Sequence, residues 1–129
     1  MSSNAIHQEI TLAAAPTRVY QLLTDSVQFA GFSGAPAEIN AEAGGAFSCF
    51  GGMISGRNIE LIANVRIVQA WRAGNWPEGT FSIVRIDLSA AGADTRLNFQ
   101  HTGFPSEQSE HLSDGWNKMY WQPLARYLG

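Results

Sequence analysis

The sequence predicts an α+β fold in which a curved antiparallel sheet of about seven strands wraps around a long C-terminal helix. Three patterns predict it: a first alternating segment with two short helical ones, a series of short strand-like segments, and helical spacing at the end. A curved sheet cannot bury its concave face on itself, so the long helix is expected to cover that face. The 129 residues suit a single domain over residues 1–129.

The first elements are a strand and two short helices. Ala5–Leu12 alternates apolar and polar residues, as a half-buried strand does. Pro16 fits the first turn of a helix, and the apolar residues after it recur at helical spacing. A second short helix is expected around Ser26–Phe32, closed by Gly31 and Gly34. Both helices therefore lie between the first and second strands.

Six further segments are rich in β-branched or aromatic residues, which predicts strands. Short stretches of turn residues separate them, and such stretches join neighbouring antiparallel strands, whereas parallel pairs need long crossovers. The predicted strands are Ala37–Asn40, Ala46–Phe50, Ile54–Ile62, Val65–Arg72, Gly79–Leu88 and Thr95–Thr102.

The last segment, Ser109–Leu128, has apolar and aromatic residues at helical spacing. Pro123 falls inside it and is expected to bend or locally break the helix, because proline lacks the backbone donor and clashes with the preceding turn. Whatever space remains between this helix and the sheet is expected to be an apolar cavity.

Composition restricts the function classes. Eight basic and eleven acidic residues give a net charge of −3, which lacks the basic footprint of nucleic-acid binding. No apolar run approaches the ~20 residues of a membrane span, and no secretory signal is visible at the start. The single cysteine, Cys49, fits a reducing compartment, so a cytoplasmic protein is expected. The only lysine, Lys118, excludes a GxxxxGK[ST] phosphate loop.

A set of alternating strand residues and helix residues is expected to line the sheet–helix cavity. Two interpretations stay open: these side chains fill the space as core, or they surround a ligand. The candidates are Phe47, Trp71, Val84, Ile86, Leu97, Phe99, His101, Trp116, Tyr120 and Leu124.

No catalytic constellation stands out. His101 could orient a ligand or transfer a proton, but a histidine hydrogen-bonded at the end of its strand is the commoner arrangement. Cys49 and His101 could form a nucleophile–base pair only if the fold brought them together, and no third orienting residue is indicated. Glu60 interrupts an apolar strand; outward exposure is expected, and an inward position would need a partner such as Arg72 or a raised pKa.

Metal and cofactor sites are not expected. His7, His111 and Cys49 have no metal-ligand spacing to one another. The glycines of residues 44–56 lie between predicted strands rather than between a strand and a helix, so they indicate turns or bulges instead of a phosphate site.

The turn Asn75–Gly79 is a candidate contact surface for a partner protein. Its tryptophan either anchors a partner, since tryptophan is enriched in interface hot spots, or folds back over the sheet edge. The partner-contact candidates are Asn75, Trp76, Pro77 and Glu78.

Several local segments resemble a known family. In chain order they read FAGFSGAP, EAGGAF, ISG, RIVQAWR, NWPEG and GWNKMYW, at residues 29–36, 42–47, 54–56, 66–72, 75–79 and 115–121. Together they resemble the C-terminal domain of the activator of heat-shock protein 90 ATPase, within the START-like (SRPBCC) superfamily of helix-grip folds. The resemblance runs from about Ile6 to Gly129, and WPEG is its most particular feature. The eukaryotic activator also carries a separate N-terminal domain that this sequence does not contain.

This resemblance implies a helix-grip fold and a non-enzymatic accessory domain with a co-chaperone-like role in the stress response. The implied partner is a heat-shock protein 90-type chaperone, contacted through a surface that includes the Asn75–Gly79 turn. The alternative is a carrier or sensor of a small hydrophobic ligand held between sheet and helix. An enzyme that uses the cavity is a third interpretation, although no catalytic residue and no cofactor is indicated.

Overall fold

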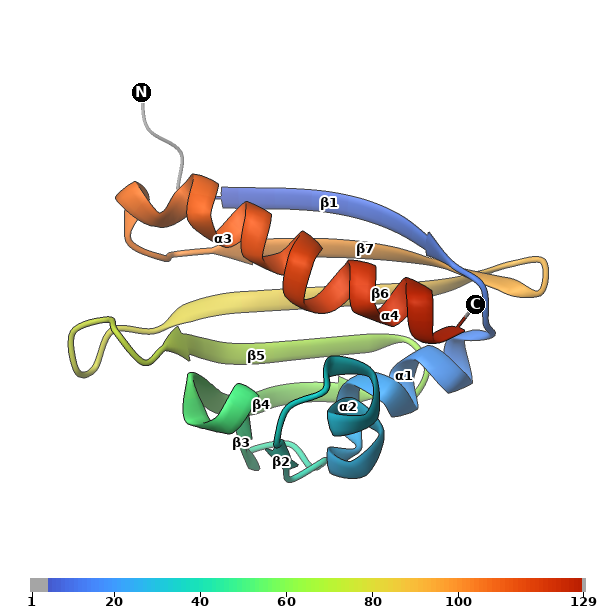
Figure 1. Ribbon diagram of the computed structural model, residues 1–129, viewed down its shortest axis with the longest axis horizontal. Coiled ribbons are helices and arrows are strands. Elements are labelled where there is room, and N and C mark those ends of the chain that lie inside the picture. The colour runs from blue at the N-terminus through green and yellow to red at the C-terminus, as the bar shows by residue number, and fades with distance from the viewer. Residues whose placement is uncertain (1–4, 129) are drawn as a thin grey trace.

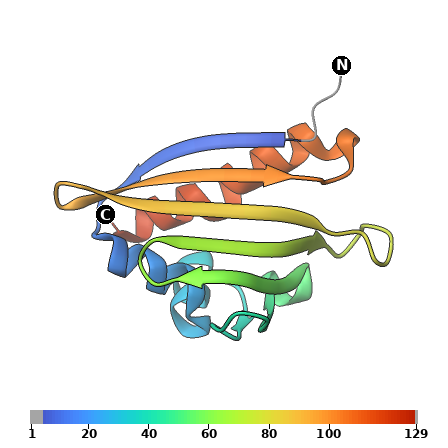
Figure 2. The same cartoon turned by 180° about the vertical axis from the view of Figure 1, so that it is seen from behind.

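The structure is a computed structural model that describes residues 5–128 and contains a seven-stranded antiparallel sheet (Figure 1). The strands follow the order β1-β7-β6-β5-β4-β3-β2, so the first strand pairs with the last at one edge (Figures 1 and 2). Their bounds are Ala5–Leu12 (β1), Glu38–Ile39 (β2), Ala46–Cys49 (β3), Ile54–Ile62 (β4), Arg66–Ala73 (β5), Ser82–Ala91 (β6) and Asp94–Thr102 (β7). The sheet confirms the predicted fold class.

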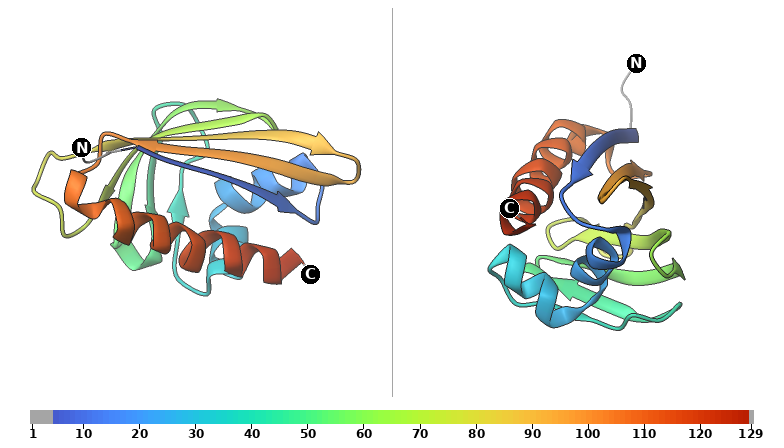
Figure 3. Two further views of the ribbon diagram at one scale, coloured as in Figure 1. Left: turned by 90° about the horizontal axis from the view of Figure 1, so that it is seen from above. Right: turned by 90° about the vertical axis from the view of Figure 1, so that its right-hand side faces the viewer.

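Helices cover one face of this sheet (Figure 3). The long C-terminal helix runs along that face, and the two short helices lie beside it at one end of the molecule (Figures 1 and 3). The helices are α1 (Pro16–Thr24), α2 (Ser26–Ser33), α3 (Ser109–Gly115), the π-helical segment η3 (Trp116–Trp121) and α4 (Gln122–Leu128), with 3-10 turns η1 (Phe50–Gly52) and η2 (Ser106–Gln108).

Strand β6 begins three residues later than predicted. It starts at Ser82, because Gly79 adopts a positive φ of 83° and the Thr80 N–H bonds to the Pro77 carbonyl, which keeps this stretch in the turn. Strand β2 is also shorter than predicted, with only Glu38–Ile39 paired to β3.

The C-terminal helix widens before Pro123 instead of breaking. Over η3 the helix is π-helical, and the Gln122 N–H bonds to the Asn117 carbonyl five residues earlier. Figure 3 shows the helix continuing through this segment. The wider turn also brings Trp116, Tyr120 and Trp121 to the buried side. The expected bend is therefore replaced by a π-helical segment, a feature that occurs preferentially at functional sites.

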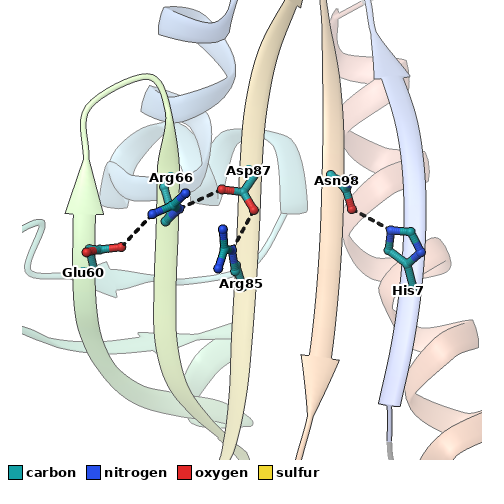
Figure 4. A network of polar contacts seen from close by, with 6 residues as sticks. All are labelled: His7, Glu60, Arg66, Arg85, Asp87 and Asn98. Atoms are coloured by element: carbon teal, nitrogen blue, oxygen red, sulfur yellow. Dashed lines mark hydrogen bonds and ion pairs between the residues drawn. The ribbon is translucent and has the colours of Figure 1, made fainter.

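A β-bulge in β4 turns Glu60 outward. The pairing with β5 shifts between Asn58 and Glu60, so Asn58 faces the buried side and Glu60 the opposite side. There Glu60 lies 3.4 Å from Arg66, within a surface network in which Asp87 also binds Arg66 and Arg85 (Figure 4). The expected exposure of Glu60 is confirmed.

Gly56 permits the close approach of two strands. A Cβ atom built at Gly56 would lie 1.8 Å from the Ala70 carbonyl oxygen and 3.0 Å from the Phe47 ring. Both neighbours belong to the packed sheet, so neither can move without disturbing it.

The Gly56→Ala variant is therefore expected to lose stability, by ~2 kcal/mol or more, because overpacking strains the backbone. Urea unfolding of this variant and of Gly115→Ala would measure it. At Gly115 an added Cβ meets nothing within 4 Å, and alanine favours the helix there. A Gly56→Ala variant as stable as the parent protein would contradict this packing.

Candidate functional site

Aromatic side chains fill the centre of the space between sheet and helix. The Trp116 ring lies 4.3 Å from Phe99, 5.5 Å from Trp71 and 4.0 Å from Tyr120, measured between ring centroids. A remaining central void of about 10 Å³ has room for no more than about one water. At the centre of the space between sheet and helix, these side chains therefore fill the volume as core and do not surround a ligand.

A larger pocket of about 420 Å³ lies at one end of the groove. It is bounded by η1 and the start of β4, by the end of β5 with the turn after it, and by α3 and η3. The residues that line it are Phe50, Met53, Ile54, Trp71, Ala73, Gly74, Asn75, Gln108, His111, Leu112, Gly115, Trp116, Met119 and Tyr120.

Of the predicted cavity residues, Trp71, Trp116 and Tyr120 line this pocket. The structure places the others in the buried core instead, because the large rings occupy the volume that an open cavity would need. These are Phe47, Val84, Ile86, Leu97, Phe99, His101 and Leu124.

The sequence prediction missed most of the pocket wall. Leu112 lies four residues before Trp116 and Met119 three residues after it, so helical periodicity could have placed both on the same face as Trp116. Phe50 and Met53 flank a glycine turn with no periodic signal, and their position is set by the tertiary fold.

His101 is fully buried and joins the helix to the sheet. Trp116 Nε1 donates to His101 Nδ1 at 3.0 Å, and His101 Nε2 lies 2.7 Å from Ser82 Oγ. The Ser82 hydroxyl donates in turn to the Trp71 carbonyl at 3.0 Å. Since an indole N–H only donates, Nδ1 must accept, and the ring is the neutral tautomer with its proton on Nε2.

This arrangement removes His101 from acid–base chemistry at ordinary pH. Burial lowers its pKa to about 3. Protonation at Nδ1 would also place an N–H donor directly opposite the indole N–H of Trp116. Burial also raises the pKa of the Cys49 thiol to about 12, so it is not a thiolate nucleophile. Strands β3 and β7 are separated by four strand spacings, or ~19 Å along the sheet, so Cys49 and His101 form no pair.

Two residues of β5, Trp71 and Arg72, hold the Asn75–Gly79 turn in place. Trp76 is buried and packs against Trp71 with ring centroids 5.6 Å apart. The Arg72 guanidinium donates to the Trp76 carbonyl at 2.7 Å and to the Pro77 carbonyl at 3.3 Å. Asn75, Pro77 and Glu78 are exposed. Contact with a partner stays a prediction for this turn, with Trp76 acting as its support.

The polar side chains on the outer face form surface pairs. His7 bonds to Asn98 at 2.7 Å, on the same face as the Glu60–Arg66–Asp87 network (Figure 4). Burial alone would raise the pKa of Asp87, but hydrogen bonds from Arg66 and Arg85 outweigh it and lower the pKa.

Within residues 5–128, no group of three or more metal-ligating side chains gathers, and none of the helices has the length and apolarity to cross a membrane.

The buried neutral His101 predicts an acid-sensitive stability. In the unfolded chain its pKa is ~6.5, so between about pH 6.5 and pH 3 only the unfolded state binds the proton. The free energy of unfolding should fall with decreasing pH, by up to ~1.4 kcal/mol per unit, in urea titrations between pH 6.5 and 4.5. The lowered pKa of Asp87 acts below that window.

His101→Gln keeps an acceptor for Trp116 and a donor for Ser82, so it should flatten this dependence. Equal slopes in the parent protein and His101→Gln would show that His101 is not the group responsible.

Comparison with known proteins assigns the family. The family described as "Activator of Hsp90 ATPase homolog 1-like protein" matches residues 13–129. The human activator of 90 kDa heat shock protein ATPase homolog 1 is 29% identical over 119 residues, and mouse homolog 2 is 31% identical over 124 residues. These matches cover 92% and 96% of this chain but only 35% and 38% of those proteins, so the chain spans about a third of their length.

A solved structure agrees along the whole chain. The crystal structure of an HSP90 activator from Plasmodium falciparum superposes with a TM-score of 0.91 at 25% identity, covering 97% of this chain and 96% of that one. Its helix-grip architecture matches the sheet and C-terminal helix described above. The chain belongs to the family of Activator of Hsp90 ATPase homolog 1-like proteins.

Proposed function

We propose that this protein is a non-enzymatic co-chaperone that binds a heat-shock protein 90-type chaperone in the cytoplasm and raises its ATP hydrolysis during stress. The family match carries the proposal, because the proteins that it resembles are named as activators of that ATPase. The Plasmodium protein, which is described as an HSP90 activator and matches 97% of this chain, also supports the proposal.

The buried chemistry of the domain supports a regulatory role. Its central histidine is neutral and hydrogen-bonded on both nitrogens, and its cysteine is buried with a raised pKa. Neither group is arranged to transfer a proton or attack a substrate. An activator of this kind acts by binding, and it must bind the ATPase-competent conformation of the chaperone more tightly than the other conformations.

The Asn75–Gly79 turn is the surface that we assign to the chaperone. Arg72 fixes two of its carbonyl groups and Trp76 fixes its base, so little conformational entropy is lost when a partner binds. The exposed side chains at the tip are polar or rigid, with one carboxylate on Glu78.

Reversing the charge of Glu78 should weaken the complex, because a charge at the rim of an interface governs encounter with its partner. We expect Glu78→Lys to raise the concentration needed for half-maximal stimulation of the chaperone ATPase by roughly threefold to tenfold. Glu9→Lys makes the same charge change on the exposed face of β1 and should behave as the parent protein.

The measurement is ATP hydrolysis by the purified chaperone of the same organism, titrated with each variant and checked by circular dichroism for folding. Identical curves for all three proteins would exclude the turn as the contact surface. No stimulation and no binding by the parent protein would overturn the proposed function itself.

A further inference from the structure

Two large apolar side chains are exposed on the outer face of the sheet, which is the face opposite the helices (Figure 2). Six of the seven phenylalanines in the chain are buried, whereas Phe81, directly before β6, is 49% exposed. Ile83 is 43% exposed and points to the same side, because the buried Ser82 lies between them. Ala70 pairs with Ile83, so the apolar surface continues onto β5. Single exposed apolar residues are ordinary, but adjoining ones with a polar rim mark interaction sites.

Two arginines form the rim of this apolar surface. Arg57 on β4 pairs with Ala70, and the guanidinium carbon of Arg72 lies 5.9 Å from the centre of the Phe81 ring. Arg57 donates to a backbone carbonyl at 3.0 Å, and Arg72 donates to two carbonyls of the turn. Within residues 5–128 neither forms an ion pair with a carboxylate, so both positive charges stay uncompensated. We call the following residues the outer patch: Arg57, Ala70, Arg72, Phe81 and Ile83.

The neighbouring arginines on the same face already have carboxylate partners. Asp87 binds Arg66 and Arg85 at 2.8 Å each, and Glu60 lies 3.4 Å from Arg66 (Figure 4). The outer patch contains no carboxylate of its own, although the chain as a whole has a net charge of −3. An apolar centre with an uncompensated cationic rim is complementary to a partner that presents carboxylates around an apolar side chain.

The outer patch adjoins the Asn75–Gly79 turn. Arg72 belongs to both, because its guanidinium donates to two carbonyls of the turn and lies over the Phe81 ring. A partner seated on the turn therefore reaches the patch without a gap.

We propose that the outer patch is a second part of the chaperone contact surface, and that it receives a segment in which carboxylates flank an aliphatic or aromatic side chain. The apolar side chain covers Phe81 and Ile83, and a carboxylate pairs with Arg57. The inference rests on the proposed function for the identity of the partner, but it concerns a face of the sheet that the Glu78 experiment does not test.

The test measures the dissociation constant of each variant for the purified chaperone of the same organism by isothermal titration calorimetry at low salt. Arg57→Glu should raise this constant by roughly fivefold to twentyfold, because it replaces an attraction with a repulsion. Arg57→Lys keeps the charge and should stay within about twofold of the parent protein. Arg96→Glu is the matched control: Arg96 is exposed on β7 and forms no ion pair within the described residues, but it lies near the opposite end of the same face, so affinity should not change.

A second pair of variants tests the apolar centre. Phe81→Ala should raise the dissociation constant by roughly fivefold or more, as the loss of an aromatic anchor does. Val27→Ala removes apolar surface from a residue that is 80% exposed on α2, among the helices, and should bind as the parent protein does. Urea unfolding of each variant checks that the domain is folded.

The outcomes separate this inference from the proposed function. No binding by the parent protein would overturn the proposed function and the inference with it. Binding by the parent protein that a folded Arg57→Glu or Phe81→Ala variant leaves unchanged would overturn the inference alone. An Arg96→Glu variant that binds as weakly as Arg57→Glu would also overturn it, because the effect would then follow net charge and not the outer patch.

Discussion

The hydrogen bond between the indole of Trp116 and the imidazole of His101 is the interaction on which the rest of this structure depends. It joins the C-terminal helix to β7, and through Ser82 it continues to β6 and to the Trp71 carbonyl on β5. All three side chains are buried, so each group in the chain must find its partner there. This series of hydrogen bonds therefore fixes both the distance of the helix from the sheet and the rotation of the helix about its own axis.

The position of the helix then determines where free volume remains between the helix and the sheet. With Trp116 centred over the sheet, the rings of Phe99, Trp71 and Tyr120 close the middle of the groove. Free volume remains at the end, where α3 and η3 face the beginning of β4. The same end carries the Asn75–Gly79 turn, and Asn75 belongs to both the turn and the pocket wall. The candidate contact surface and the candidate ligand site are thus neighbours on one rigid support.

Local pattern predicted most of the fold but not the site. Alternation predicted β1 and the content of β-branched residues predicted β4, both with their observed bounds, and short turns predicted the antiparallel order. The π-helical segment was missed, because helical spacing and Pro123 predict a bend or a break and give no signal for a wider turn that brings three aromatic residues to the buried side. The pocket was misplaced for the same reason: whether Phe99 or His101 lines a cavity depends on the volume filled by residues distant in sequence. The burial of Trp76 depends on its packing against Trp71, five residues earlier on β5, which the turn pattern does not predict.

The protonation state of His101 tests this account most directly. The nitrogen chemical shifts of its imidazole, followed by 15N NMR from pH 7.5 to pH 5, report which nitrogen carries the proton. The structure predicts a neutral ring with its proton on Nε2 throughout that range, because Nδ1 accepts from Trp116 and burial lowers the pKa to about 3. A ring that titrates near pH 6.5, or a proton found on Nδ1, would contradict the central hydrogen bond and the helix position derived from it.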